Sequence, residues 1–145
     1  MDDPITWMRA QLDDDERVAR EATWGPWEVG PTFGGRDNRV YVKPEGPGID
    51  TIGTCVIAGQ VANTPQYRAN AQHIARHDPA RVLAEVDAKR RILDAHPIEY
   101  SKVSEYTDCA ACVDVDSYDA YPCLTVRLLA LPYADRPGYR DEWRP

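Results

Sequence analysis

The sequence predicts an α+β protein in which a small antiparallel sheet of about three strands packs with amphipathic helices. Apolar residues recur at helical spacing near the N-terminus and again in the middle of the chain. Between these two segments lie short β-rich runs that glycine and proline separate. Clustered cysteines follow the last long helix, and they predict a zinc-knuckle-like C-terminal segment followed by short helices.

Length, composition and charge limit the class of protein. The chain has 145 residues, of which 43% are hydrophobic, so we expect one core and a single domain over residues 1–145. We find no run of about 18 apolar residues and no basic, then apolar, secretory signal at the N-terminus. We therefore expect a cytoplasmic protein with no membrane partner. The net charge of −7 disfavours nucleic acid as a partner.

Residues 4–22 have the pattern of an amphipathic helix. Asp3 can cap free backbone amides, and Pro4 loses no hydrogen bond at the first helical position. One helical stripe is apolar and consists of Ile5, Met8, Leu12 and Ala19. The acidic run 13–15 lies largely off this stripe, which predicts that it faces solvent.

The small sheet is predicted within residues 24–60. Its strands are short β-rich runs bounded by glycine and proline, at residues 27–30, 38–43 and 51–58. Three short strands need a cover over one face, and the flanking helices can supply it.

Residues 65–95 predict two helices that break at Asp78-Pro79. The residue before a proline is pushed out of the α region, so the first helix ends at His77 and Asp78 can cap the second. The second helix is predicted to turn its apolar residues inward, namely Val82, Leu83, Val86, Ile92 and Leu93.

Residues 96–145 form the predicted zinc-stabilised C-terminal segment. From Ile98 to Pro122 the sequence has no clear period, which is uncommon in a compact domain unless something else organises the chain. Residues 124–131 then predict a short apolar helix that Pro132 stops, and residues 135–143 a final turn or short helix.

The cysteines of this segment have the spacing of zinc ligands. Cys109 and Cys112 form a C-x2-C pair, Cys123 follows as a third ligand, and His96 is the best fourth ligand because it stands at the end of a predicted helix. Four protein ligands leave no open position for water. We therefore predict one structural zinc ion per chain.

Alternatives to this zinc site stay open. The cysteines could be small buried residues or a redox C-x2-C pair, although the βαβ context of a redox motif is missing. His73 and His77 are spaced i, i+4 on one helical face and compete with His96 for the fourth position.

Several stretches of the chain resemble an uncharacterised family of short actinobacterial and actinobacteriophage proteins, a domain of unknown function. The most specific of these stretches read HIARHDPARVL from residue 73 and PCLTVRLLA from residue 122, the second continuing into PYAD at 132–135. The resemblance implies no activity. What it implies about His96 and the cysteines agrees with the predicted zinc site.

These observations lead to three functional hypotheses. The first is a non-enzymatic, zinc-stabilised binding or adaptor protein, a phage or prophage accessory factor that acts through protein–protein contacts. It rests on the absence of a readable catalytic motif and on a surplus of tryptophan and tyrosine. The second is a small enzyme or nucleotide-binding protein with a site near His73, His77 and Asp78. The third is a nucleic-acid-linked factor that binds through C-terminal arginines or mimics DNA with its acids.

Overall fold

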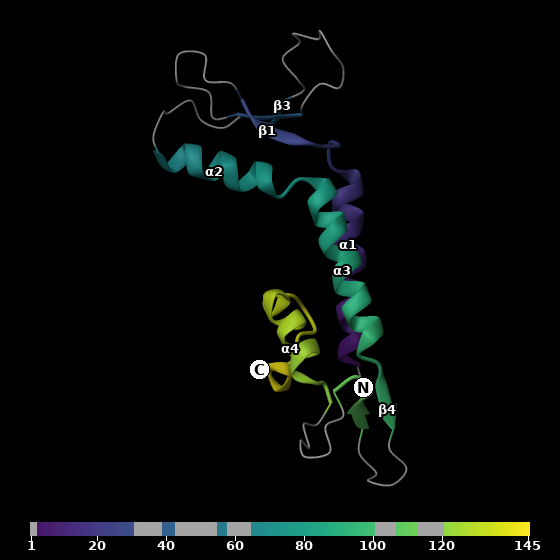
Figure 1. The fold of residues 1–145 in the computed structure, drawn as a ribbon. Helices are drawn as coiled ribbons and strands as arrows, with labels where there is room; N and C mark the ends of the chain where they lie inside the picture. Colours follow the sequence, from purple (N-terminus) through teal and green to yellow (C-terminus); the bar gives the residue numbers. More distant parts are fainter. Residues whose placement is uncertain (1–2, 31–38, 43–54, 58–64, 101–106, 113–120) are drawn as a thin grey trace. The chain divides into compact units, whose positions relative to one another are not determined.

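The computed structural model describes residues 3–30, 39–42, 55–57, 65–100, 107–112 and 121–145 (Figure 1). The chain divides into two compact units. Unit 1 contains residues Met1–Asp15 and Val86–Pro145, and unit 2 contains residues Glu16–Glu85. The single domain that the sequence predicts stays a prediction.

Unit 1 is built on two helices, the first part of α1 (Pro4–Glu21) and the last part of α3 (Pro79–Ala95). Two ion pairs join them, from Arg9 to Asp94 at 2.6 Å and from Arg90 to Asp13 at 2.5 Å. Because the earlier residue of one helix pairs with the later residue of the other, the helices run antiparallel. Apolar side chains of these two helices are almost completely buried, namely Met8, Leu12 and Leu93.

The predicted helix starts are confirmed, and the predicted inward face of α3 is wrong at one position. The Asp3 carboxylate accepts a hydrogen bond from the Thr6 amide at 3.0 Å, which caps α1. Ile92 was expected inside but is 36% exposed. Val86 and Leu93 are seven residues apart and share the buried face, whereas Ile92 is rotated about 100° from Leu93.

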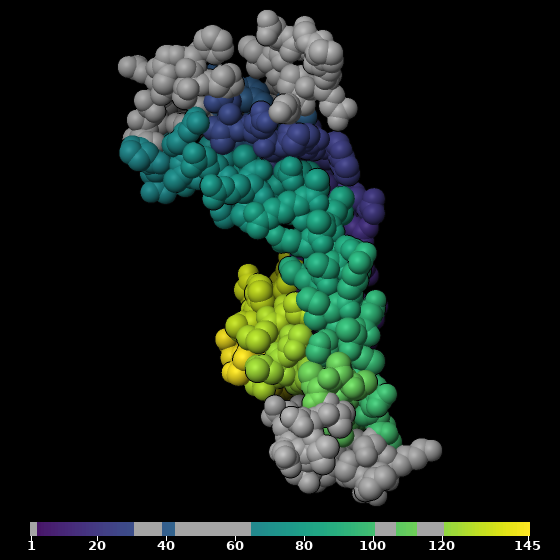
Figure 2. All heavy atoms as spheres, in the orientation of Figure 1, coloured from purple at the N-terminus to yellow at the C-terminus, as the bar shows by residue number. Residues whose placement is uncertain are grey.

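The C-terminal part of unit 1 contains α4 (Leu124–Ala130) and two 3-10 helices, η2 (Leu131–Tyr133) and η3 (Asp141–Trp143). Figure 2 shows this segment, in yellow-green, against the residues of α3 that belong to the same unit. The Trp7 ring of α1 lies 5.7 Å from the Tyr139 ring and 5.4 Å from the Trp143 ring. Aromatic packing therefore holds the C-terminus to the start of the chain.

A polar network also holds η2 to the two helices. The Tyr133 hydroxyl donates to Asp15 at 2.9 Å and accepts from Lys89 at 2.9 Å. Arg136 pairs with the same aspartate at 2.5 Å. Burial raises the pKa of Tyr133, with the hydrogen bond from Lys89 acting in the opposite direction. The tyrosine therefore stays a neutral donor.

Unit 2 contains an antiparallel sheet of three short strands in the order β1 (Trp27–Val29), β2 (Val40–Val42) and β3 (Cys55–Ile57). Helix α2 (Pro65–Arg76) packs on β1 and β2, as the sequence predicts for a flanking helix. The break between α2 and α3 lies at Asp78-Pro79, as predicted, and the Asp78 carboxylate accepts from the Arg81 amide at 2.9 Å. Residues 31–38, 43–54 and 58–60 of the predicted sheet region 24–60 lie outside the described residues.

A second sheet, which the sequence did not predict, lies in unit 1. It consists of β4 (Ile98–Tyr100) and β5 (Thr107–Cys109), which pair antiparallel with Ile98 opposite Cys109. The predicted α+β class is confirmed, now with two small antiparallel sheets. Among the residues that the structure describes, no helix is long and apolar enough to cross a membrane.

Candidate metal centre

The β4–β5 pair brings distant parts of unit 1 together around one point. His96 follows the last residue of α3, and the strand register then sets Cys109 beside the start of β4. The Ala110 amide donates to the Pro97 carbonyl at 3.0 Å, and the Cys112 amide donates to the Cys109 carbonyl at 3.1 Å. These bonds form the turn that carries the C-x2-C pair.

Cys123 reaches the other cysteines and His96 from the segment that leads into α4. The Tyr121 amide donates to the Thr107 carbonyl at 3.3 Å, which returns the chain to β5. Cys123 then occupies the N-cap position of α4 with extended backbone angles and no side-chain capping bond. Its sulfur is therefore available to the cluster.

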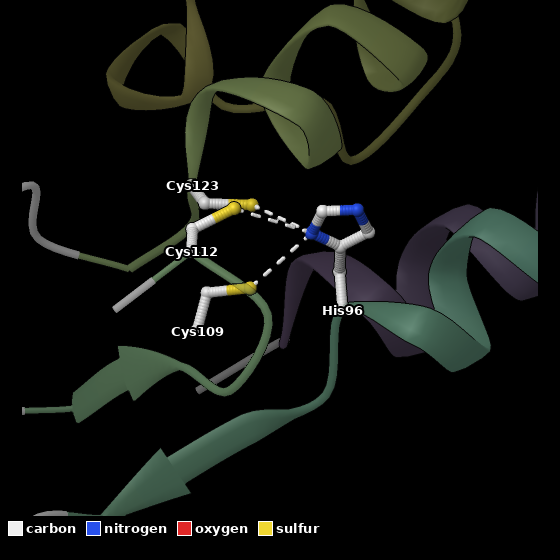
Figure 3. A group of neighbouring side chains, drawn as sticks. All are labelled: His96, Cys109, Cys112 and Cys123. Atoms are coloured by element: carbon white, nitrogen blue, oxygen red, sulfur yellow. Dashed lines mark hydrogen bonds between the residues drawn. The ribbon is translucent and has the colours of Figure 1, made fainter. Parts of the chain in front are cut away.

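Figure 3 shows the resulting cluster, in which three sulfur atoms face one imidazole nitrogen. The ligand atoms of His96, Cys109, Cys112 and Cys123 all lie within 4.8 Å of one another. The distances from His96 Nδ1 to the Sγ atoms of Cys109, Cys112 and Cys123 are 3.3, 3.4 and 3.7 Å.

These distances match a tetrahedral zinc site. A nitrogen at 2.0–2.1 Å and a sulfur at 2.3 Å from a zinc ion, at tetrahedral angles, lie about 3.6 Å apart. A single ring nitrogen has one proton or one lone pair and cannot satisfy three sulfur partners by hydrogen bonding. A cation between the four atoms satisfies them all. The group of His96 and the three cysteines is thus compatible with zinc.

The protonation state of Cys112 depends on whether the cluster holds a cation. Desolvation, together with hydrogen bonding to Cys109 and Cys123 and their charge, raises the pKa of the Cys112 thiol to about 11. The Cys112 thiol therefore resists ionisation by itself. A dication reverses this preference, because coordinated thiols are deprotonated.

The ligands differ in exposure to solvent. The buried thiols are Cys109, which is 4% exposed, and Cys123, which is 3% exposed. Cys112 is exposed. Burial suits a structural site, and the exposed cysteine gives solvent access to one sulfur.

The competing histidines lie elsewhere, in unit 2. His73 and His77 are exposed, their ring centroids are 4.5 Å apart, and His77 Nδ1 donates to the His73 carbonyl at 2.8 Å. Neither belongs to the cluster that the structure forms around His96. Asp78, the third residue of the alternative site, is engaged in capping α3.

The C-terminal arginines are paired with acids. Arg140 pairs with Glu142 at 3.3 Å, and Arg144 pairs with Asp141 at 3.0 Å. Arg136 pairs with Asp15. Pairing lowers the positive potential that a basic nucleic-acid surface requires.

Sequence reasoning missed the strand pair that positions the ligands. Each strand has only three residues, too short a run for the alternation Ile-Glu-Tyr of β4 to predict a strand, and β4 is exposed along its whole length. The local signal is a few β-favouring residues between His96 and the C-x2-C pair, namely Ile98, Tyr100 and Thr107.

Fold and cluster together define a small α+β protein with a Cys3His group that could hold a metal ion. The chain belongs to the family of unknown function DUF6221, which it matches over residues 1–145. This match confirms the predicted resemblance to an uncharacterised family without an established activity. No curated protein and no solved structure matches the chain.

Proposed function

We propose that this chain is a non-enzymatic binding protein whose C-terminal segment is stabilised by one structural zinc ion. The observation that carries the proposal is the convergence of four ligand atoms, from His96, Cys109, Cys112 and Cys123, within 4.8 Å. Four protein ligands complete a tetrahedron and leave no position for substrate or water. The ion would therefore contribute to folding rather than to catalysis.

The proposed ion would tie together three segments of unit 1. His96 lies at the end of α3, and the C-x2-C pair lies at the end of β5 and in the turn after it. Cys123 lies at the start of α4. Strands of three residues have few ladder bonds and little apolar contact of their own. Metal coordination supplies the stability that this region otherwise lacks.

Apolar side chains on α4 and η2 support a binding role through protein contacts. Leu124, Leu128 and Leu131 have the i, i+4, i+7 spacing of one helical face, and they are 51%, 51% and 38% exposed. On the opposite face, Val126 and Ala130 are buried. A helix whose start is fixed by a metal ligand presents such a face rigidly, which lowers the entropic cost of binding.

The proposal extends to cell compartment and biological context. Thiolate ligands persist in a reducing compartment, so we place the protein in the cytoplasm. The resemblance to actinobacterial and actinobacteriophage proteins suggests a phage or prophage accessory factor.

Metal content tests the zinc site. Elemental mass spectrometry on purified protein should find about one zinc per chain in the wild type and much less in Cys112→Ser. Cys55→Ser is the matched control, because Cys55 lies in β3 of unit 2. Wild-type protein without zinc after expression in zinc-supplied cells would refute the site.

A charge placed on the exposed leucine face tests the binding role. Quantitative pull-downs from an actinobacterial host lysate should compare Leu128→Glu with Val18→Glu, whose parent side chain is 53% exposed on α1. Partners that bind the wild type and Val18→Glu but not Leu128→Glu support contact through α4. Partners that bind all three proteins equally would contradict it.

A further inference from the structure

The three cysteines of the cluster are not equivalent toward reagents in solvent. Cys109 and Cys123 are almost fully buried, whereas Cys112 is exposed. Its sulfur is nevertheless within 4.8 Å of both other sulfurs. One thiolate is therefore accessible to an oxidant, with a second thiolate close enough to complete a disulfide.

We propose that Cys112 is the oxidation-sensitive ligand of this cluster, and that a peroxide converts it and a neighbouring cysteine to a disulfide, which dismantles the zinc site. This inference rests on the proposed function, since it assumes that the four residues hold zinc. It adds a regulatory property, namely loss of the metal under oxidising conditions.

The chemistry requires a two-electron peroxide oxidant and nothing else. The Cys112 thiolate attacks one oxygen of hydrogen peroxide, the O–O bond breaks, and the leaving hydroxide takes a proton to become water. The product is a sulfenic acid on Cys112. A second thiolate attacks the sulfenic sulfur and expels the other oxygen as hydroxide, which also becomes water. Two thiolates are oxidised to one disulfide and the peroxide is reduced to two waters.

Cys109 is the expected partner in this disulfide. It shares a short turn with Cys112, and the backbone bond from the Cys112 amide to the Cys109 carbonyl closes that turn. Rotation of the turn residues can bring the two sulfurs to bonding distance, about 2.05 Å. Cys123 belongs to a separate segment at the start of α4.

Disulfide formation leaves His96 and a single cysteine, too few ligands for a four-coordinate structural site. The rest of unit 1 keeps its own contacts, because Asp15 holds Tyr133 and Arg136, and Trp7 packs on the C-terminal rings. Oxidation should therefore loosen the β5 turn and the start of α4 without unfolding the helices. The change is local and reversible by a thiol reductant.

The test begins with zinc-loaded wild-type protein whose metal content has been measured. A preparation that never contains zinc refutes the proposed function, whereas the steps below address the oxidation alone. Hydrogen peroxide is added, zinc release is followed with a colorimetric chelator, and disulfides are mapped by peptide mass spectrometry. We expect zinc release together with a Cys109–Cys112 disulfide. A Cys112–Cys123 disulfide also supports the role of Cys112, with a different partner.

The control variant is Cys112→His, which keeps four zinc ligands but lacks the exposed thiol. Its zinc release should be slower by about tenfold or more, because buried thiols react slowly. Release at the wild-type rate would overturn the proposal, and so would a Cys109–Cys123 disulfide in the wild type. If the variant does not load zinc, limited iodoacetamide labelling of the loaded wild type decides, with preferential modification of Cys112 expected and uniform modification contradicting it.

Discussion

Lowering the free zinc concentration in a metal buffer should lower the melting temperature of this chain. The perturbation acts on the cluster of His96 and three cysteines, whose nitrogen–sulfur distances of 3.3, 3.4 and 3.7 Å are already close to the tetrahedral value. The folded chain therefore holds these four ligand atoms where a zinc ion would need them. Binding to the folded state then contributes to stability by mass action.

The size of the effect follows from this linkage. Above the dissociation constant, each tenfold increase in free zinc adds about 1.4 kcal/mol to the free energy of unfolding. A chain of this length gains about 2–4 °C in melting temperature per kcal/mol, so each tenfold step should add about 3–6 °C. Cys109→Ser should show no such slope.

Two measurements make the prediction specific. Circular dichroism in zinc buffers gives the slope, with magnesium as the control ion. Hydrogen exchange should show faster exchange around Thr107–Cys112 in zinc-free protein, while amides near Met8 and Leu12 stay protected because those side chains are buried. A melting temperature that is independent of zinc, in protein shown to bind it, would refute this reasoning.

Three further predictions concern unit 1. Asp15→Asn should lower the free energy of unfolding by about 2 kcal/mol in a denaturant titration, because the half-buried carboxylate accepts hydrogen bonds from two side chains. The control Asp87→Asn, in an exposed ion pair on α3, should lower it by under about 0.5 kcal/mol. Equal losses in the two variants would contradict the network. Gly138→Ala should lower the free energy of unfolding by about 1–2 kcal/mol or more, because the residue has φ of 86° and a Cβ would lie 2.9 Å from Trp7 Nε1. An unchanged melting temperature would argue against this geometry. Burial raises the pKa of Tyr133 above 10.0, so the folded state favours the neutral phenol, and stability should be full below about pH 10 and fall as the pH rises through the raised pKa. Unfolding titrations between about pH 9 and pH 11 should show a shallower fall in Tyr133→Phe, and an identical fall would contradict the assignment.

The helices were predictable because their signals are local. Caps and proline positions predicted the start of α1 at Pro4 and the break at Asp78-Pro79, and both are found there. Each signal acts on backbone groups within a few residues, so it does not depend on the rest of the fold. The residue types and spacing of the C-x2-C pair are equally local.

What the sequence by itself determined is therefore the helices and the α+β class, and it also supplied the candidate metal ligands. Only the tertiary structure decided that His96, rather than His73 or His77, lies with the cysteines, since this depends on the register of β4 and β5. It likewise decided that Trp7 meets rings near the C-terminus. The physical reason is the same in both cases. Contacts between residues far apart in sequence depend on strand register and on how all the buried side chains pack together, and no short window of sequence records either.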